Sequence, residues 1–103
     1  MTRYRLTPQA RSDLLDITDY MLEQASPERA GYVIAIIREA IEKLADMPGL
    51  GHKREDLTTE DVRFWNVFKY YIVYRPETIP LEVVAIISGW RDVPNELTGR
   101  IDD

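Results

Sequence analysis

Apolar side chains recur at helical spacing in the first quarter of the chain. The repeating positions are Ala10, Leu14, Ile17 and Met21, which fall on one face of a helix. Thr7 before them is a residue type that caps helix N-termini. Pro8 suits the first helical position, because its missing N–H needs no partner there. The pattern therefore predicts an amphipathic helix from Gln9 to Gln24.

A second helical pattern follows after a short break. Ser26 and Pro27 repeat the capping signal, and Pro48-Gly49 ends the pattern. The apolar positions between them are Val33, Ile36, Ile37, Ala40, Ile41 and Leu44, with Tyr32 beside them. Two helices joined by about three residues run antiparallel, so residues 9–47 are predicted to form a helical hairpin. A small sheet can cover part of its broad apolar face, and the rest is available to a partner.

Strand patterns occupy most of the remaining sequence. Strand-forming residues fill four stretches: Arg3–Leu6, Arg63–Val67, Tyr70–Arg75 and Leu81–Ser88. The last stretch is apolar on both faces after its second residue, which predicts a central strand. Residues 49–61 are polar and glycine-punctuated, so they are expected to form a loop, and the prolines around residues 76–80 suit a hairpin turn. Residues 94–103 are expected to be a polar tail, either a short helical turn or frayed.

The resulting element order is β-α-α-β-β-β within one domain of 103 residues. It predicts an α+β fold in which a helical hairpin packs on a small, mainly antiparallel sheet. The composition, 45% hydrophobic and 30% charged, is typical of a globular protein. The absence of cysteine excludes disulfides and zinc–thiolate sites. The apolar runs are too short to cross a bilayer, so a cytoplasmic location without membrane contact is expected.

Aromatic and basic side chains intermix on the two middle strands. Strand alternation sets Phe64, Asn66 and Phe68 against Arg63, Trp65 and Val67, and sets Tyr70, Ile72 and Tyr74 against Tyr71, Val73 and Arg75. One set is needed as core beneath the helices, so the other set is predicted to form an exposed face for protein contact. Such a face can also stack the bases of single-stranded nucleic acid. The net charge of −5 opposes that alternative, and we expect no direct nucleic-acid binding.

Two further groups of polar residues have both a chemical and a structural interpretation. His52 is the one histidine, but a general base needs a nucleophile nearby, and none adjoins it in the sequence. We therefore interpret it as a solvated loop residue. The first helix carries Asp13, Asp16, Asp19 and Glu23 on its polar side. Carboxylates can bind metal, but no second set of ligands converges with these, so we interpret them as a solvated face and expect no metal or cofactor.

Four short motifs, in this order and spacing, resemble the RelE/ParE superfamily of bacterial toxins. They are "LTPQARSDLLDITDYM", "MPGLGHKREDL", "VRFWNVFKYYIVYRP" and "IISGWRD". The likeness extends from Tyr4 to Val93 and is closer to the ParE-type plasmid-stabilisation toxins of type II toxin–antitoxin systems. It implies a RelE/ParE-like fold.

The resemblance implies one of two modes of action. RelE-type members cut messenger RNA on the ribosome with a cluster of Lys and Arg, whereas ParE-type members are associated with poisoning DNA gyrase. The cluster would fall near residues 62–64, Tyr71 and Arg91, where Arg63 and Arg91 are basic, and a late catalytic side chain would fall near Leu97. Leu97 cannot titrate and Tyr71 replaces an arginine, so ribonuclease chemistry is disfavoured and no catalytic residue is assigned. On the resemblance we therefore expect a toxin that binds and inhibits DNA gyrase. The alternatives are a ribosome-dependent mRNA endonuclease and a non-toxic module that binds its antitoxin.

The resemblance also implies a cognate ParD-like antitoxin. Its C-terminal segment would wrap the toxin, typically as a helix in a hydrophobic groove, to form a hetero-oligomer. We expect apolar burial on the two helices, with local contacts to Arg54, Arg63 and Arg91, to outweigh repulsion between an acidic tail and this acidic chain. The candidate contacts with antitoxin or target are Tyr32, Ile36, Arg54, Arg63, Trp65, Tyr71, Trp90 and Arg91.

Overall fold

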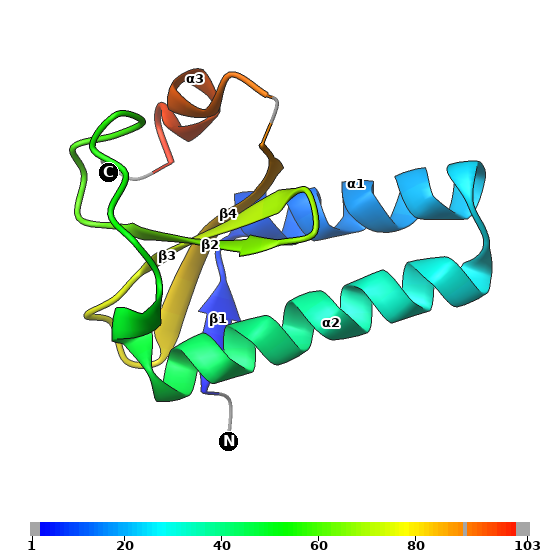
Figure 1. Ribbon diagram of the computed structural model, residues 1–103, viewed down its shortest axis with the longest axis horizontal. Coiled ribbons are helices and arrows are strands. Elements are labelled where there is room, and N and C mark those ends of the chain that lie inside the picture. Colours follow the sequence, from blue (N-terminus) through cyan, green and yellow to red (C-terminus); the bar gives the residue numbers. More distant parts are fainter. Residues whose placement is uncertain (1–2, 90, 101–103) are drawn as a thin grey trace.

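The computed structural model describes residues 3–89 and 91–100. Along the chain it contains β1 (Tyr4–Leu6), α1 (Pro8–Gln24), α2 (Pro27–Asp46), the 3-10 turn η1 (Pro48–Leu50), β2 (Arg63–Val67), β3 (Tyr70–Arg75), β4 (Leu81–Ser88) and α3 (Val93–Leu97). Figure 1 shows α1 and α2 as an antiparallel pair beside the sheet. The predicted order and the α+β class are confirmed, and η1 and α3 are added to them.

Local chemistry fixes where the two long helices begin. The Thr7 hydroxyl accepts a hydrogen bond from the backbone N–H of Ala10 at 3.1 Å, and the Ser26 hydroxyl accepts one from Arg29 at 3.1 Å. Each cap satisfies an N–H that has no partner within the helix. A proline follows each cap directly, as the sequence predicts.

The sheet has the strand order β1-β4-β3-β2. Both β2–β3 and β3–β4 pair antiparallel, whereas β1 pairs parallel to β4, so the sheet is mixed. The prediction of a central final strand is confirmed, because β4 lies between β1 and β3. The three residues of β1 pair with Leu81–Val83, so the rest of that edge of β4 extends beyond β1.

The helical hairpin covers one face of the sheet. Its buried stripe includes Leu14, Ile37, Ile41 and Leu44, which pack against the sheet residues Val67, Tyr70, Ile72, Tyr74, Val83 and Ile86. The alternation predicted for β3 is confirmed, since its first, third and fifth residues all face this core. Apolar area buried here contributes the main favourable free energy of folding.

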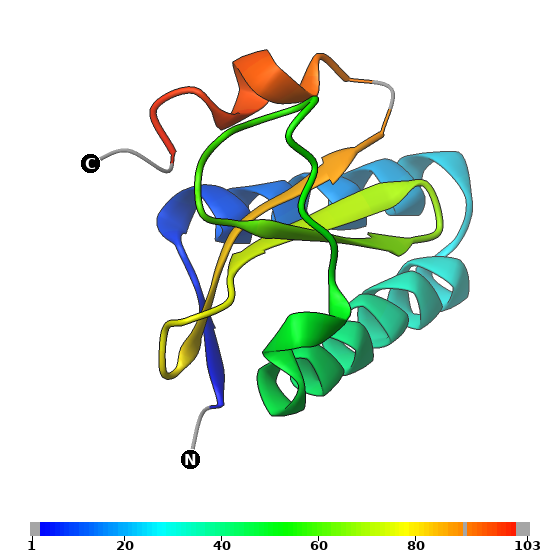
Figure 2. The same ribbon diagram turned by 60° about the vertical axis from the view of Figure 1, so that its left-hand side comes forward.

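The opposite face of the sheet is covered as well, and the prediction of an exposed face is wrong. Phe64, Val73 and Ala85 are buried beneath the segment between η1 and β2 and beneath α3. Figures 1 and 2 show α3 and this segment on one side of the sheet and α2 on the other. Val93 and Leu97 are four residues apart on α3, so both side chains reach the sheet. The polar C-terminal tail is therefore partly a structural element.

Asp13 corrects a second expectation. Its carboxylate accepts a hydrogen bond from the backbone N–H of Ile86 at 2.9 Å and forms a bidentate pair with Arg100, at 2.6 and 3.2 Å. The Asp13 and Arg100 side chains are 13% and 15% exposed, so Asp13 is not solvated. It accepts a backbone hydrogen bond from the edge of β4 beyond the residues that pair with β1. The hydrogen bond to Asp13 raises the pKa of Arg100 above its usual value.

Tyr74 ties the sheet to the turn after α2. Its buried hydroxyl donates to the Pro48 carbonyl at 2.6 Å and accepts from the Gly51 N–H at 2.9 Å. A Cβ on Gly51 would lie 2.5 Å from this hydroxyl, which explains why a glycine stands there. Burial raises the pKa of Tyr74. The loop that leads to β2 therefore starts from a fixed point.

Candidate protein-binding surfaces

Two of the predicted contact residues pair with each other. Arg54 forms two hydrogen bonds with the Asp56 carboxylate, at 2.8 and 3.0 Å, and a third with the Tyr71 hydroxyl, at 3.1 Å. The Tyr71 ring packs edge-on against Phe64, with 5.7 Å between the ring centroids. The hydrogen bonds with Asp56, which have the larger effect, and with Tyr71 raise the pKa of Arg54 above its usual value. Both side chains therefore hold the loop on the sheet.

Arg63 also has a partner within the chain. Its guanidinium donates to the Gly51 carbonyl at 2.8 Å. His52 bonds the backbone of Phe64 in both directions, and its exposed ring stacks beside Trp65 with 6.4 Å between ring centroids. These contacts attach the loop to β2.

Three of the positions at which the resemblance implied a ribonuclease site carry apolar side chains, whereas Arg63, Tyr71 and Arg91 stand at the others. Val62, Phe64 and Leu97 are all buried in the core beneath α3. Within the described part of the chain, no cluster of three or more His, Asp or Glu side chains is arranged to hold a metal ion.

Arg91 lines a small cavity between α1 and the free edge of β4. The cavity has a volume of about 250 Å³, and Asp16, Tyr20, Lys69 and Ser88 also contribute to its wall. A guanidinium nitrogen of Arg91 lies 3.7 Å from the Glu96 carboxylate. The predicted contact Trp90 lies outside the described residues.

A groove of about 600 Å³ lies between α1, α2 and β1. Its apolar lining comprises Tyr4, Leu6, Leu14, Leu15 and Ile34, and its basic lining comprises Arg5, Arg11 and Arg38. We call it the arginine-rimmed groove. Asp and Glu are absent from its described lining, although Arg5 pairs with Glu82 at 2.7 Å and Arg38 donates to the Tyr4 hydroxyl at 3.1 Å.

The sequence predicted an apolar helical surface but not this arginine rim. The arginines come from three separate elements, and their proximity depends on the parallel placement of β1. One signal was present, because Leu15 widens the apolar stripe of the first helix beyond its core-facing positions. Leu15 is 60% exposed at the groove.

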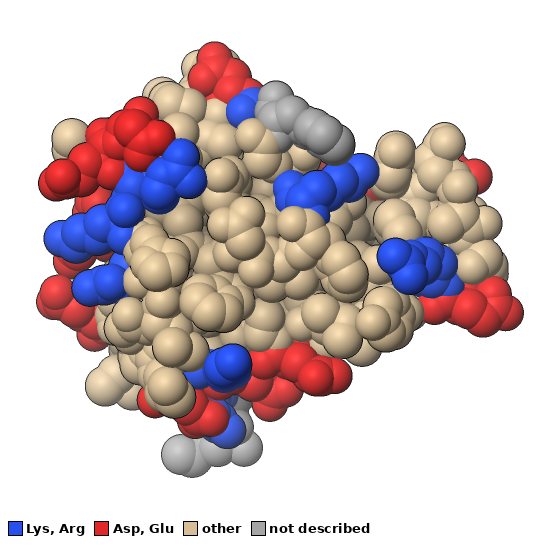
Figure 3. Space-filling model, viewed as in Figure 1, with Lys and Arg blue, Asp and Glu red and all other residues tan. Residues whose placement is uncertain are grey.

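A second exposed surface lies on the other side of α2. It consists of the exposed Tyr32 and Phe68 and the half-buried Trp65, with Arg29, Lys43 and Lys69, and we call it the aromatic face. Three cations lie over rings: Arg29 over Tyr32 at 5.4 Å, Lys43 over Trp65 at 5.9 Å and Lys69 over Tyr20 at 5.0 Å. Figure 3 shows an uncharged centre on this side of the molecule, with Lys and Arg but also Asp and Glu around it.

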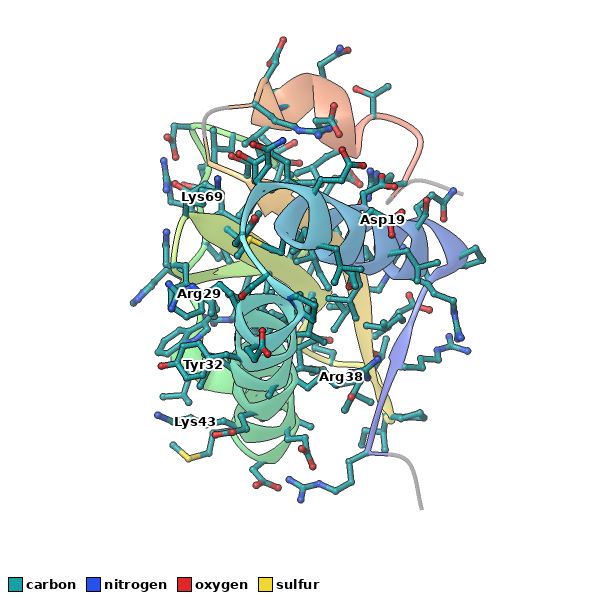
Figure 4. All side chains as sticks on the ribbon, turned by 90° about the vertical axis from the view of Figure 1, so that its right-hand side faces the viewer. Asp19, Arg29, Tyr32, Arg38, Lys43 and Lys69 are labelled. Carbon is teal, nitrogen blue, oxygen red and sulfur yellow. The ribbon has the colours of Figure 1, made fainter. Side chains whose placement is uncertain are left out.

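Figure 4 separates the two surfaces. Arg29, Tyr32, Lys43 and Lys69 point to one side, and Arg38 points to the opposite side of α2. Of the predicted contacts, the structure brings Tyr32 and Trp65 to the aromatic face. Ile36 is half-buried and packs against the hairpin-side core. Sequence reasoning missed Arg29, Lys43 and Phe68. Arg29 precedes Tyr32 by three residues on the same helix, a spacing that the sequence shows. The places of Phe68 beside Tyr32 and of Lys43 over Trp65 depend on how α2 packs on the sheet.

Comparisons with known proteins place this fold in a family. The chain is similar to a solved structure described as the chromosomal ParDE TA system from P. aeruginosa, with 21% identity and a TM-score of 0.70. The match covers 82% of this chain and 92% of that one. No curated protein matches the chain. The family described as "ParE toxin of type II toxin-antitoxin system, parDE" matches residues 4–93. The chain therefore belongs to the ParE toxin family of type II toxin–antitoxin systems.

Proposed function

We propose that this protein is the toxin of a type II toxin–antitoxin pair that inhibits DNA gyrase and is neutralised by a ParD-like antitoxin bound directly to it. The observation that carries the proposal is the family match over residues 4–93. The exposed apolar surfaces on both sides of α2 support a role that depends on protein contacts.

The arginine-rimmed groove is the proposed antitoxin site. An amphipathic helix with apolar residues on one face and flanking carboxylates matches its apolar lining and its arginines. This differs from the contacts expected from the sequence, because Arg54 and Arg63 already bond within the chain. Local charge therefore favours an acidic tail although the whole chain carries a net charge of −5.

We further propose that the toxin acts by binding rather than by cleaving RNA. Cleavage needs a base, an acid and cations around the scissile phosphate. The buried Val62, Phe64 and Leu97 support this proposal, since they occupy positions that such a site would use. No observation favours the endonuclease or the non-toxic module over the gyrase-directed toxin.

Controlled expression in bacteria tests the mode of action. The proposal expects growth arrest with filamentation and an SOS response, because a poisoned gyrase leaves broken DNA, and co-expressed antitoxin should relieve all three. Rapid arrest of translation with cleaved messenger RNA would instead support the endonuclease. Normal growth with a stable antitoxin complex would support the non-toxic module.

No helix in the described part of the chain is long and apolar enough to cross a membrane.

A further inference from the structure

The turn between β2 and β3 contains an aromatic residue in an unfavourable conformation. Phe68 and Lys69 form the two-residue connection, and Phe68 has a φ of 55°. Glycine or asparagine is favoured at a positive φ, because a bulky side chain crowds the backbone there. The Phe68 side chain is 49% exposed, so complete burial in the core does not offset this strain. Strain kept at an exposed aromatic residue points to a function.

The surroundings of Phe68 make it part of a larger binding surface. Its ring lies 6.3 Å from that of Tyr32, which is 52% exposed on α2. Arg29 of α2 lies over the Tyr32 ring. Lys43, farther along α2, lies over the ring of Trp65 on β2. Trp, Tyr and Arg, which this surface presents together, are the residue types that most often dominate the binding energy of protein interfaces.

Two of the three cations of this surface, Arg29 and Lys43, differ from Arg54 and Arg100. Arg54 and Arg100 pair with Asp56 and Asp13, respectively. Among the described residues, Arg29 and Lys43 form no ion pair and contact aromatic rings instead. A carboxylate from a partner can therefore bind either cation without displacing an internal one.

We propose that the aromatic face binds the protein on which this toxin acts, and that this partner presents carboxylates around an apolar side chain. The inference rests on the proposed function, in which the partner is gyrase. The antitoxin groove lies on the other side of α2, so the two activities are separable by substitution (Figure 4). A stacking platform for single-stranded nucleic acid is disfavoured, because the Tyr32 and Phe68 rings are tilted by 56° and cations already lie over Tyr32 and Trp65.

Phe68→Gly is the most informative variant, because glycine suits the backbone of the turn. We expect its melting temperature to equal or exceed that of the wild type. Its inhibition of gyrase supercoiling should weaken about tenfold or more, as for loss of an interface hot spot. Its affinity for the antitoxin should change by less than about twofold, because Phe68 is remote from the groove. Arg29→Glu should weaken inhibition in the same way.

Two controls accompany these variants. Ile79→Ala removes an apolar side chain that is 98% exposed at the β3–β4 turn and belongs to neither surface as defined, so it should leave inhibition unchanged. Growth arrest on expression provides a second readout that does not depend on the identity of the target. Phe68→Gly should lose growth arrest while Ile79→Ala keeps it.

The outcomes separate this inference from the proposed function. If the wild type arrests growth without inhibiting gyrase, the gyrase assignment fails, and loss of arrest in Phe68→Gly still supports the inference. Wild-type potency in Phe68→Gly would overturn the inference. So would an equal loss of antitoxin affinity, which would make the aromatic face part of the antitoxin interface. Single-stranded DNA or RNA binding by the wild type that Phe68→Gly abolishes would also overturn it. A wild type that does not arrest growth would overturn both.

Discussion

The two faces of the sheet are covered by different means. One lies beneath α1 and α2, two long helices whose apolar periodicity spans many turns. The other lies beneath the five-residue α3 and an irregular segment attached by a few contacts, including Arg54 with Tyr71 and Asp13 with Arg100. The hairpin side is therefore expected to determine global stability, whereas the α3 side is expected to open locally at a lower free-energy cost.

The largest expected effect comes from the hairpin side. Ile41 is completely buried between α2 and the sheet, so Ile41→Ala should lower the free energy of unfolding by about 3 kcal/mol through lost apolar contact and a cavity. Urea unfolding followed by circular dichroism measures this. Ile41→Val is the matched control and should cost about 1 kcal/mol. A loss well below 1 kcal/mol for Ile41→Ala would contradict the claim that the hairpin side determines global stability.

Asp13→Ala should have the next largest effect. It leaves Arg100 without its carboxylate and the Ile86 N–H without its acceptor, for a cost of about 2 kcal/mol. Urea unfolding measures the global part, and hydrogen exchange at Ile86 reports the local part. Asp13→Asn keeps an oxygen acceptor but loses the charge, so an intermediate result is expected. Equal stability of Asp13→Ala and wild type would show that the contact contributes nothing.

Leu97→Ala tests how much the α3 side contributes to stability. Leu97 is buried against the sheet, but α3 is one short helix that can relax or detach, so the loss should be at the low end for a core leucine, about 2 kcal/mol. Hydrogen exchange should accelerate first in residues 52–62 and α3, before the hairpin. Uniform acceleration through α1 and α2 would instead mean that the two sides open together.

The smallest effect concerns acid pH. The hydrogen bond from Arg54 lowers the pKa of Asp56 in the folded protein. Stabilisation by this pair is therefore complete above the unfolded-state pKa and is lost as the pH falls through the lower folded-state pKa. The pair is exposed to solvent, so the change should be slight. Thermal unfolding from about pH 5 downward measures it, and Asp56→Asn should remove this component.

The sequence was informative where one local pattern determined the outcome. Helix starts followed from Thr7-Pro8 and Ser26-Pro27, and the bounds of β2, β3 and β4 followed from their apolar residues and turns. The parallel pairing of β1 with β4 could not be predicted from the sequence, because a strand of three residues does not indicate its direction relative to its neighbour. A helical turn near α3 was one of two alternatives, but its packing on the sheet was missed because its two buried residues lie within a polar segment.

The candidate sites were harder to predict than the fold. Asp13 has the same sequence signature as its solvated neighbours, and its role depends on the point where β1 ends along β4. Arg54 and Arg63 resembled free contact residues, but Arg54 binds Asp56 and Tyr71, and Arg63 binds the Gly51 carbonyl. The positive φ of Phe68 has no signal in its residue type, which disfavours that conformation.

The most direct test of the account is a gyrase supercoiling assay with the purified toxin, with and without its antitoxin. We expect inhibition or trapped DNA breaks that the antitoxin relieves. Arg11→Glu in the arginine-rimmed groove should weaken that relief, because it places a like charge opposite the antitoxin carboxylates. Undiminished supercoiling at high concentrations of folded toxin would contradict the claim that this protein inhibits gyrase.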